Sequence, residues 1–490
     1  MLFNSIHFIF FFVIVTTLYF IIPHKYRWAL ILIASSYFYM FFIPIYILIL
    51  LFVITVDYFA GILIEKHTGL KRKAFLIMSL AANLGVLGFF KYFNFIGENI
   101  STIFNFLGIT NHFVDLNIIL PIGLSFHTFQ AMSYTIEVYR GNYKAERHPG
   151  IYATYVMFYP QLVAGPIEKP QHLLPQLKSE HYFEDNRVSD GLKLMLIGFL
   201  KKLVIADRLA IYVNTIYGHY IHHSGISLLL ATVFFSFQIY CDFSGYTDIA
   251  RGAARVMGIN LIENFRLPYL SRSITEFWRR WHISLSVWFR DYLFLPISYA
   301  LTRKLHIANS KQKEIIIYGI AALITFFLCG LWHGANWTFV IWGLGHGILL
   351  LSSRIFKNTR IKIRKLFHLS SNSPLLTLFQ IVFTFLVVTL LWVFFRSPNL
   401  AISMLVLNKI FTFSGPLFIG DNVDGSSFAY SIIVIIALVV YEIKMEFLPG
   451  RILIFNNPKL IVRLISIAFI IAVIFLLGVF DGSQFIYFQF

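Results

Sequence analysis

Long apolar runs separated by short basic loops dominate the pattern of hydrophobic and polar positions. An apolar run of about 17–25 residues can cross a bilayer as a helix. Runs that meet or approach this length lie near residues 6–22, 28–42, 44–63, 74–95, 118–138, 191–216, 227–257, 315–331, 337–352, 375–395, 429–443 and 461–479. We therefore predict an all-α polytopic membrane protein with about 11–12 transmembrane or re-entrant helices plus interfacial helices.

Two segments interrupt this pattern. Residues 150–182 include FYPQLVAGPIEKPQHLLPQL, with four prolines, and prolines in series break helices. We predict a broken, partly buried or re-entrant stretch there. Residues 258–292 are amphipathic, aromatic and basic, and we predict that they lie along or just below the cytoplasmic interface. The chain has no internal repeat and no long linker, so residues 1–490 are predicted to form a single transmembrane domain.

Composition and charge agree with a membrane protein. Hydrophobic residues make up 58% of the chain and charged residues 13%, against about a quarter in soluble proteins. The net charge of +17 sits in short loops, which indicates anionic membrane lipid as a partner and no nucleic acid. Placing the basic loops at 23–27, 65–73, 140–148 and 352–365 in the cytoplasm predicts that both termini lie outside. The first apolar run has no charged segment before it and is predicted to be a retained span.

Residues 331–347, LWHGANWTFVIWGLGHG, place two histidines in an apolar, glycine-rich stretch. His333 lies at a short break between two apolar runs, and an ionisable group at membrane depth usually faces the protein interior or a watery path. A neutral imidazole suits a general base, although a core histidine bonded to a carbonyl is an equally good interpretation. His346, thirteen residues later, lies on another helical face and is interpreted as structural.

Two further groups have competing interpretations. Cys329 lies one helical turn before His333, which permits a Cys-His nucleophile but more often describes a small buried cysteine. His282 lies among charged residues, including Arg279 and Arg280. This segment is either an interfacial belt that binds lipid phosphate or a segment that folds inward and places His282 opposite His333.

Other polar residues are interpreted as structural. Asp242, Asp248, Arg251 and Arg255 lie on one helical run, where Asp248 can pair with either arginine. No cluster of cysteines and histidines has metal-ligand spacing, and the HYIHH sequence at 219–223 is interpreted as a solvated external loop. The chain has no nucleotide-binding glycine loop and no serine-hydrolase elbow.

Several motifs together resemble the membrane-bound O-acyltransferase family, in particular its bacterial alginate O-acetyltransferase branch. The motifs are LPIGLSFHTFQAMSY at 120–134, PQLVAGPIEKPQHLLPQL at 160–177, DFSGYTDIARGAARVMGINLIENFRLPY at 242–269, WRRWHISLSVWFRDYLFLPI at 278–297, the LWHGANWTFVIWGLGHG stretch and the terminal FIYFQF. The resemblance covers essentially the whole chain.

The resemblance implies an acyltransferase of the bacterial cytoplasmic membrane, with helices around a central funnel or tunnel. A cytoplasmic thioester such as acetyl-CoA is the expected donor, and no bound cofactor or metal is expected. The expected acceptor is a surface polysaccharide such as alginate, reached through an SGNH-like periplasmic or extracellular partner. The family's two motif histidines correspond to His333 and His282, and Arg279 and Arg280 are placed to attract the donor's phosphates. His333 is then expected in a hydrated constriction where donor and acceptor meet.

Three alternatives stay open at this point. Within the enzyme class, the acceptor can be peptidoglycan or teichoic acid and the acyl group acetyl or D-alanyl. A proton-coupled transporter would use His333 as a relay, and would favour inverted repeats, which the sequence lacks. A lipid-binding scaffold would tolerate the loss of His333.

Overall fold

The computed structural model describes residues 1–109, 113–116, 118–305, 310–366, 368, 370, 373–420, 425–448, 457, 459–480 and 485–486. Their contacts group into two compact units. Unit 1 comprises Met1–Phe199, Gly245–Ile262 and Gln484–Gln489, and unit 2 comprises Leu200–Ser244, Glu263–Ser483 and Phe490. The single domain over residues 1–490 stays a prediction.

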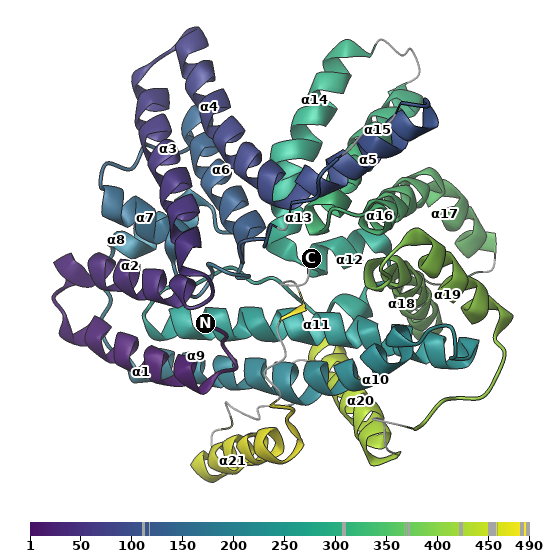
Figure 1. Cartoon of the computed structure of the whole chain (residues 1–490). Helices are drawn as coiled ribbons and strands as arrows, with labels where there is room; N and C mark the ends of the chain where they lie inside the picture. The colour runs from purple at the N-terminus through teal and green to yellow at the C-terminus, as the bar shows by residue number, and fades with distance from the viewer. Residues whose placement is uncertain are drawn as a thin grey trace. The chain divides into compact units, whose positions relative to one another are not determined.

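Unit 1 is built from helices (Figure 1). They are α1 (Ile6–Ile21), α2 (His24–Met40), α3 (Ile47–Lys66), α4 (Gly69–Leu87), α5 (Phe93–Phe106), α6 (Leu124–Arg140), α7 (Pro149–Met157), α8 (Pro170–Lys178) and α9 (Asp185–Phe199). Helices α3, α4 and α6 pack against one another pairwise and form a bundle. Unit 1 also receives the C-terminal part of the long helix α11 (Gly225–Val256).

The proline-rich segment in unit 1 is broken, as predicted. Helix α7 begins at Pro149 and α8 at Pro170, where proline costs no backbone hydrogen bond. Turns fill the intervening residues, and these are almost all buried. The carboxylate of Glu168, which is 0% exposed, ties the turns to the following segment by accepting from the backbone N–H of Ile262 at 2.7 Å.

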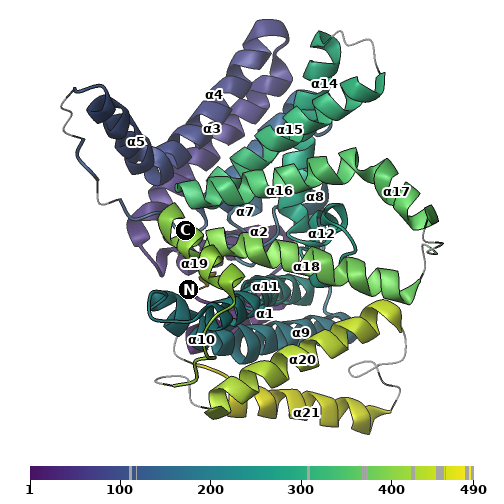
Figure 2. The same cartoon turned by 90° about the vertical axis from the view of Figure 1, so that its right-hand side faces the viewer.

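Unit 2 contains the N-terminal part of α11 and the remaining helices. They are α10 (Asp207–Gly218), α12 (Ile274–Arg280), α13 (Ile283–Phe289), α14 (Leu295–Lys304), α15 (Ser310–His333), α16 (Trp337–Ile355), α17 (Lys357–Leu366), α18 (Pro374–Arg396), α19 (Leu400–Thr412), α20 (Gly425–Phe447) and α21 (Leu460–Leu477). Figure 2 shows α15 and α16 side by side, with α18 along the other side of α16.

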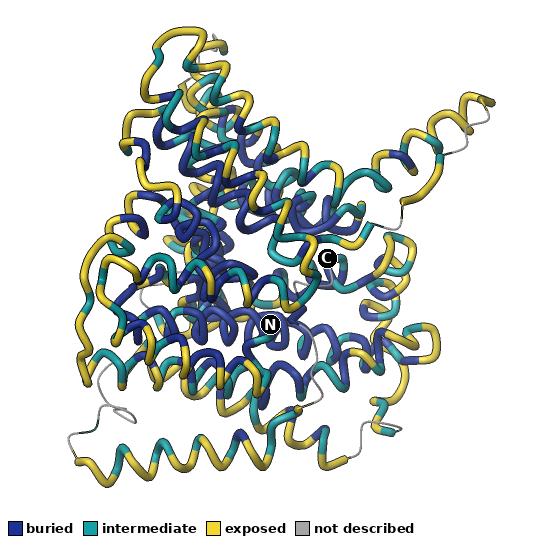
Figure 3. The backbone as a smooth tube through the Cα atoms, turned by 60° about the vertical axis from the view of Figure 1, so that its left-hand side comes forward, coloured by how far each residue is buried: buried dark blue, intermediate teal, exposed yellow. Residues whose placement is uncertain are grey.

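The helices confirm an all-α polytopic membrane protein. Within the described residues, eight helical segments are long and apolar enough to span a membrane. They are Pro44–Lys66, Gly69–Phe106, Gly225–Val256, Ser310–His333, Trp337–Ile355, Pro374–Arg396, Gly425–Phe447 and Leu460–Leu477. Most of α21 is exposed, as lipid-facing surface would be (Figure 3).

Several predicted spans differ in length from the helices observed. Residues 6–22, 28–42 and 118–138 correspond to α1, α2 and α6, which have 16 or 17 residues. The run at 191–216 is divided by a π-helical turn at Leu200–Ala206. The run at 74–95 is part of a longer helical segment, Gly69–Phe106.

Candidate functional site

His333 is placed by the tight hairpin of α15 and α16. The two helices approach closely because Gly330 and Gly343 lie at their contact: a Cβ on Gly330 would lie 2.3 Å from the carbonyl oxygen of Phe339. Helix α15 ends at His333, and α16 begins after Asn336, whose side-chain oxygen accepts from the backbone N–H of Thr338 at 2.9 Å. Residues 334–336, with the sequence GAN, separate the two helices, so the His333 imidazole lies at the tip of the hairpin.

Aromatic rings surround the His333 imidazole. The ring is 4.9 Å from Trp332, 4.9 Å from Trp342 and 5.2 Å from Phe395, between centroids, and the residue is 4% exposed. The structure thus shows aromatic packing around this ring, and the hydrated funnel expected there stays a prediction. A substrate that reaches the imidazole has to displace or pass between these indole and phenyl groups.

His282 lies in a buried turn between α12 and α13. Its φ of 42° is in the left-handed region, which is unusual for a residue with a side chain. Asn264 holds the turn: its carbonyl accepts from the N–H of Ile283 at 2.9 Å and its side-chain oxygen accepts from the N–H of Ser284 at 3.1 Å. Burial lowers the pKa of His282 to about 3, so the imidazole is neutral at physiological pH.

The two predicted histidines belong to one aromatic cluster in unit 2. The Trp332 ring lies 6.0 Å from His282 and 4.9 Å from His333. Phe243 contacts the other side of His282 at 4.6 Å. His282 is 0% exposed and points into the protein, whereas Arg279 and Arg290 of the same segment are exposed. The placement of His282 opposite His333 stays a prediction.

His346 connects this cluster to α12. The indole Nε1–H of Trp278 donates to Nδ1 of His346 at 3.3 Å, and the imidazole packs 4.9 Å from Trp342. Trp342 in turn contacts His333. His346 thus packs between two indole rings, and its structural role stays a prediction.

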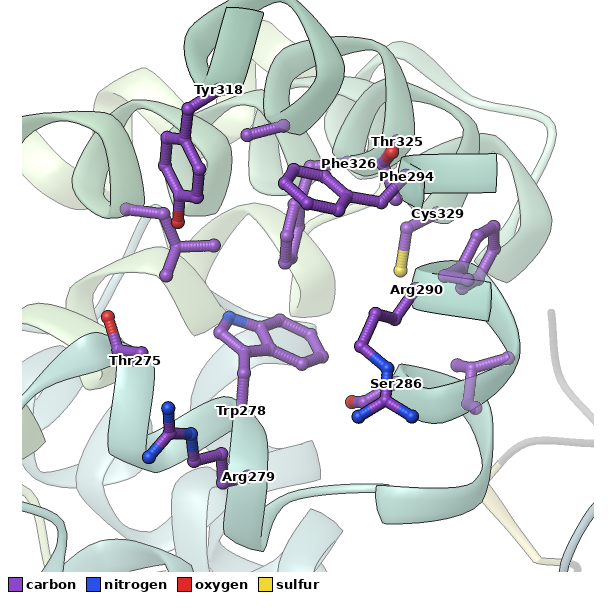
Figure 4. A pocket seen from close by; sticks show the side chains of 14 residues that line it. Thr275, Trp278, Arg279, Ser286, Arg290, Phe294, Tyr318, Thr325, Phe326 and Cys329 are labelled. Carbon is purple, nitrogen blue, oxygen red and sulfur yellow. The ribbon is translucent and has the colours of Figure 1, made fainter. Parts of the chain in front are cut away.

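A cavity of about 200 Å³ lies beside Trp278, with all its lining residues in unit 2 (Figure 4). The lining comes from α12, α13, the turn that follows it, α15 and α16: Thr275, Trp278, Arg279, Leu285, Ser286, Phe289, Arg290, Phe294, Tyr318, Ala322, Thr325, Phe326, Cys329 and Leu350. The sulfur of Cys329 points into the cavity, and Arg279 and Arg290 lie at its lower edge in this view. The cavity therefore joins two guanidinium groups to an apolar, aromatic interior.

The two neighbouring arginines have different environments. Arg279 is exposed and lines the cavity. Arg280 points to carboxylates instead: it pairs with Glu276 at 2.6 Å and with Glu446 at 2.7 Å. These bonds, the one to Glu446 above all, raise the pKa of Arg280. Arg290, which the sequence analysis did not select, takes the second cationic position on the cavity, and its Nε also donates to the adjacent Asp291 at 2.7 Å.

The polar residues of α11 form structural pairs. Arg251 lies 3.4 Å from Asp248, and Arg255 lies 3.7 Å from Asp190. Among the described residues, no group of three or more histidines, cysteines and carboxylates is placed to hold a metal, the HYIHH loop included.

A buried charge cluster in unit 2 was missed by sequence reasoning. The ammonium group of Lys202 lies 2.8 Å from Asp207 and 2.6 Å from Asp242, and all three side chains are at most 8% exposed. Burial alone lowers the pKa of Lys202, but the two carboxylates outweigh burial and raise it above its ordinary value. Lys202 and Asp207 are close in sequence, but Asp242 lies on a different helix, so only a lysine inside an apolar run could have drawn attention to the cluster.

Comparison with known proteins identifies the family. Residues 147–396 match the model of the membrane-bound O-acyltransferase family. The chain is 36% identical over 417 residues to a probable alginate O-acetylase of Pseudomonas aeruginosa, which covers 84% of this chain and 75% of that protein. It is 34% identical over 409 residues to a peptidoglycan O-acetyltransferase of Helicobacter pylori (78% of this chain, 73% of that protein). It is 30% identical over 271 residues to a teichoic acid D-alanyltransferase of Bacillus subtilis (55% and 67%). The chain belongs to the membrane-bound O-acyltransferase family and is a multi-pass membrane O-acyltransferase.

Proposed function

We propose that this enzyme transfers an acyl group, acetyl in the simplest case, from a cytoplasmic thioester to a hydroxyl group of an extracytoplasmic acceptor. The observation that carries the proposal is the cavity beside α12. It offers Arg279 and Arg290 for an anionic donor, and its wall includes Cys329, one helical turn before His333. One wall of the donor site and the base thus belong to the same helix, α15.

His333 is the proposed general base. Its imidazole takes the proton of the acceptor hydroxyl while the alkoxide oxygen attacks the thioester carbonyl. The tetrahedral intermediate then collapses, the C–S bond breaks, and the imidazolium returns its proton to the departing thiolate. The products are an O-acyl ester and a free thiol. The atoms and protons of this reaction balance without a covalent enzyme intermediate or a metal.

Two buried indole N–H groups near His333 supply the proposed stabilisation of the oxyanion. Trp342 and Trp392 are 0% exposed, their rings stack at 5.6 Å, and neither Nε1–H has an acceptor among the described residues. A buried donor without an acceptor costs free energy and calls for an explanation. Binding an oxyanion that exists only during the reaction is such an explanation, because donors fixed in advance stabilise the transition state.

His282 is the second proposed catalytic residue. Because it is neutral and contacts the same Trp332 ring as His333, its proposed part is to hold the imidazole–indole cluster in place or to pass a proton within it. Arg279, together with Arg290, is proposed to bind the donor's phosphates. Arg280, proposed for the same task from its sequence position, has its guanidinium on two carboxylates and fits the task less well.

The acceptor is proposed to be a surface polysaccharide such as alginate, acylated through a periplasmic or extracellular SGNH-like partner. The relatives named for alginate O-acetylation and peptidoglycan O-acetylation support transfer of acetyl to a glycan. The proposed location is the cytoplasmic membrane of a bacterium, with membrane lipid around the exposed apolar helices. The competing assignment is acylation of peptidoglycan or teichoic acid with acetyl or D-alanyl. A transporter that uses His333 as a proton relay is a third, less favoured assignment.

A transfer assay tests the base. Membranes containing matched amounts of wild type, His333→Ala and Cys329→Ser are given acetyl-labelled acetyl-CoA, and label in polysaccharide, peptidoglycan and teichoic acid is measured. We expect His333→Ala to lose transfer by about 10²–10⁴-fold, the usual contribution of a general base, and Cys329→Ser to retain it. Undiminished transfer by His333→Ala would remove the base role, and loss in Cys329→Ser would assign a thiol nucleophile. The fraction that carries the label identifies the acceptor.

A protection assay tests the donor site without relying on turnover. Cys241 is 0% exposed in α11 and is replaced by alanine, so that Cys329 is the sole cysteine. We expect acetyl-CoA and desulfo-CoA, but not adenosine, to slow alkylation of Cys329 by a maleimide. Equal alkylation rates with and without these ligands would place the donor elsewhere.

A further inference from the structure

Asp57 is a carboxyl group buried at the centre of the bundle formed by α3, α4 and α6 in unit 1. It is 0% exposed and lies midway along α3, inside a candidate membrane span. Ser79 and Asn83 come from one face of α4 and Thr135 comes from α6, and each of these residues is 0% exposed. The four side chains thus form a buried polar group inside the bundle.

No cation of the described residues compensates this carboxyl group. Among the described residues, no lysine, arginine or histidine nitrogen lies within 4 Å of the Asp57 oxygens, as an ion pair would require. The titratable group that faces it from the neighbouring helix α7 is Tyr152, whose hydroxyl is also buried and has no hydrogen-bond partner in the described part of the chain. An uncompensated carboxylate at membrane depth is strongly disfavoured, so an acid there usually has a proton or a function.

Counting hydrogens along the chain of contacts indicates where the proton is. Asp57 Oδ1 lies 2.6 Å from Ser79 Oγ, Ser79 Oγ lies 2.9 Å from Thr135 Oγ1, and Thr135 Oγ1 lies 3.2 Å from the carbonyl oxygen of Met132. Ser79 Oγ has one hydrogen for its two contacts, so it can donate either to Asp57 or to Thr135. When Thr135 donates to Met132 and Ser79 donates to Thr135, the hydrogen between Ser79 and Asp57 belongs to the carboxyl group.

We propose that Asp57 is a proton-binding site: a carboxylic acid that donates to Ser79, which donates to Thr135, which donates to Met132. The amide of Asn83 completes the site, because its Nδ2 lies 3.0 Å from Oδ1 and 2.8 Å from Oδ2 of Asp57. These contacts hold the plane of the carboxyl group in one orientation. When the proton leaves, Ser79 and Thr135 turn their hydroxyl hydrogens toward the carboxylate, and the contact to Met132 is lost. The bundle therefore has two hydrogen-bonded states that differ by one proton.

This site is separate from the proposed acyl transfer. The reaction proposed above uses residues of unit 2 and balances its own proton between hydroxyl and thiol, whereas Asp57 and its partners belong to unit 1. Loss of acyl transfer in a His333 variant and loss of the Asp57 proton are therefore distinguishable outcomes.

Infrared difference spectroscopy tests the proposal on the full chain in lipid nanodiscs at neutral pH. The spectrum of wild type minus Asp57→Asn is expected to contain the carbonyl stretch of a protonated carboxyl group, which shifts in D₂O. Ser79→Ala is expected to shift this band, because it removes the acceptor of the acidic hydrogen. Carboxylate bands alone in the wild-type difference spectrum would overturn the proposal.

Glu442 provides a matched control. It is a second buried carboxyl group, 3% exposed, which accepts from the hydroxyl of Tyr240 at 2.6 Å in unit 2. Glu442→Gln has to leave the Asp57 band in place.

Thermal unfolding keeps the test valid if a variant folds poorly. Asp57→Asn, which replaces a neutral acid with a neutral amide, is expected to melt near wild type, and Asp57→Ala well below it. Equal losses in both would contradict the neutral acid. A carboxyl band that disappears when sodium chloride replaces choline chloride would assign the site to a metal cation and overturn the proton assignment.

Discussion

Replacing Arg279 with glutamine separates the two neighbouring arginines by function. Arg279 is exposed at the edge of the cavity, so its attraction to a donor phosphate is partly screened by water. Two unit charges about 4 Å apart attract by about 1 kcal/mol in water, and a hydrogen bond to a charged group contributes about 1.5–3 kcal/mol when it is shielded. For an exposed guanidinium the attraction to a phosphate is near the lower end of these energies, about 1–2 kcal/mol. Since about 1.4 kcal/mol is a factor of ten, KM for the donor should rise about 5–30-fold.

The assay is initial-rate acetyl transfer in membranes over a range of acetyl-CoA concentrations and two ionic strengths. A phosphate contact that is the same in ground state and transition state raises KM and leaves kcat unchanged. The effect of Arg279→Gln should shrink at high salt. A fall in kcat with an unchanged KM would refute the reasoning, because it would place Arg279 at the reacting atoms.

Two controls accompany this variant. Arg303→Gln, at the exposed C-terminal end of α14 and outside the cavity, should leave KM and kcat unchanged. Arg280→Gln removes two ion pairs and should lower the melting temperature more than it changes KM.

The remaining predictions concern buried groups in unit 2. Trp342→Phe, which removes one N–H donor, should lower kcat about 10²–10³-fold in the transfer assay with little change in KM; an unchanged kcat would exclude the oxyanion role. Lys202→Met leaves the carboxylates of Asp207 and Asp242 without their shared cation and should cost about 3–5 kcal/mol of stability, measured by thermal unfolding. Adding Asp242→Asn in a double variant should restore part of this loss. Burial lowers the pKa of His282 from 6.5 to about 3, so its contribution to stability is complete above pH 6.5 and is lost as the pH falls. Melting temperatures from about pH 7 to about pH 5 should therefore decline less in His282→Gln than in wild type, and parallel declines would count against a neutral buried His282.

The structure adds local detail to one segment whose place at the cytoplasmic interface stays a prediction. Residues 258–292 are amphipathic, aromatic and basic, and their composition predicts an interfacial stretch. In the fold, α12 and α13 are only seven residues each, and the turn between them buries Trp281 and His282. Composition indicates that part of the segment is apolar, but it does not indicate whether lipid or protein covers that part. The same limit applies to Arg279 and Arg280, whose different partners depend on Glu446 in α20.

The sequence by itself determined the class of the protein and the position of most helices. The local properties that can be identified from the sequence are apolar runs of membrane length, breaks at proline and glycine, and a motif histidine at a break. The family relationship followed from the same residues.

Tertiary structure alone decided which polar groups meet. It placed Trp278 against His346, Lys202 between two aspartates, and Asp57 beside Ser79 and Thr135. Apart from the local pair of Lys202 and Asp207, each of these contacts joins side chains from different helices. Whether a buried acid meets a cation, a hydroxyl group or another ring depends on how those helices rotate and approach as they pack, and no spacing along the chain encodes that rotation.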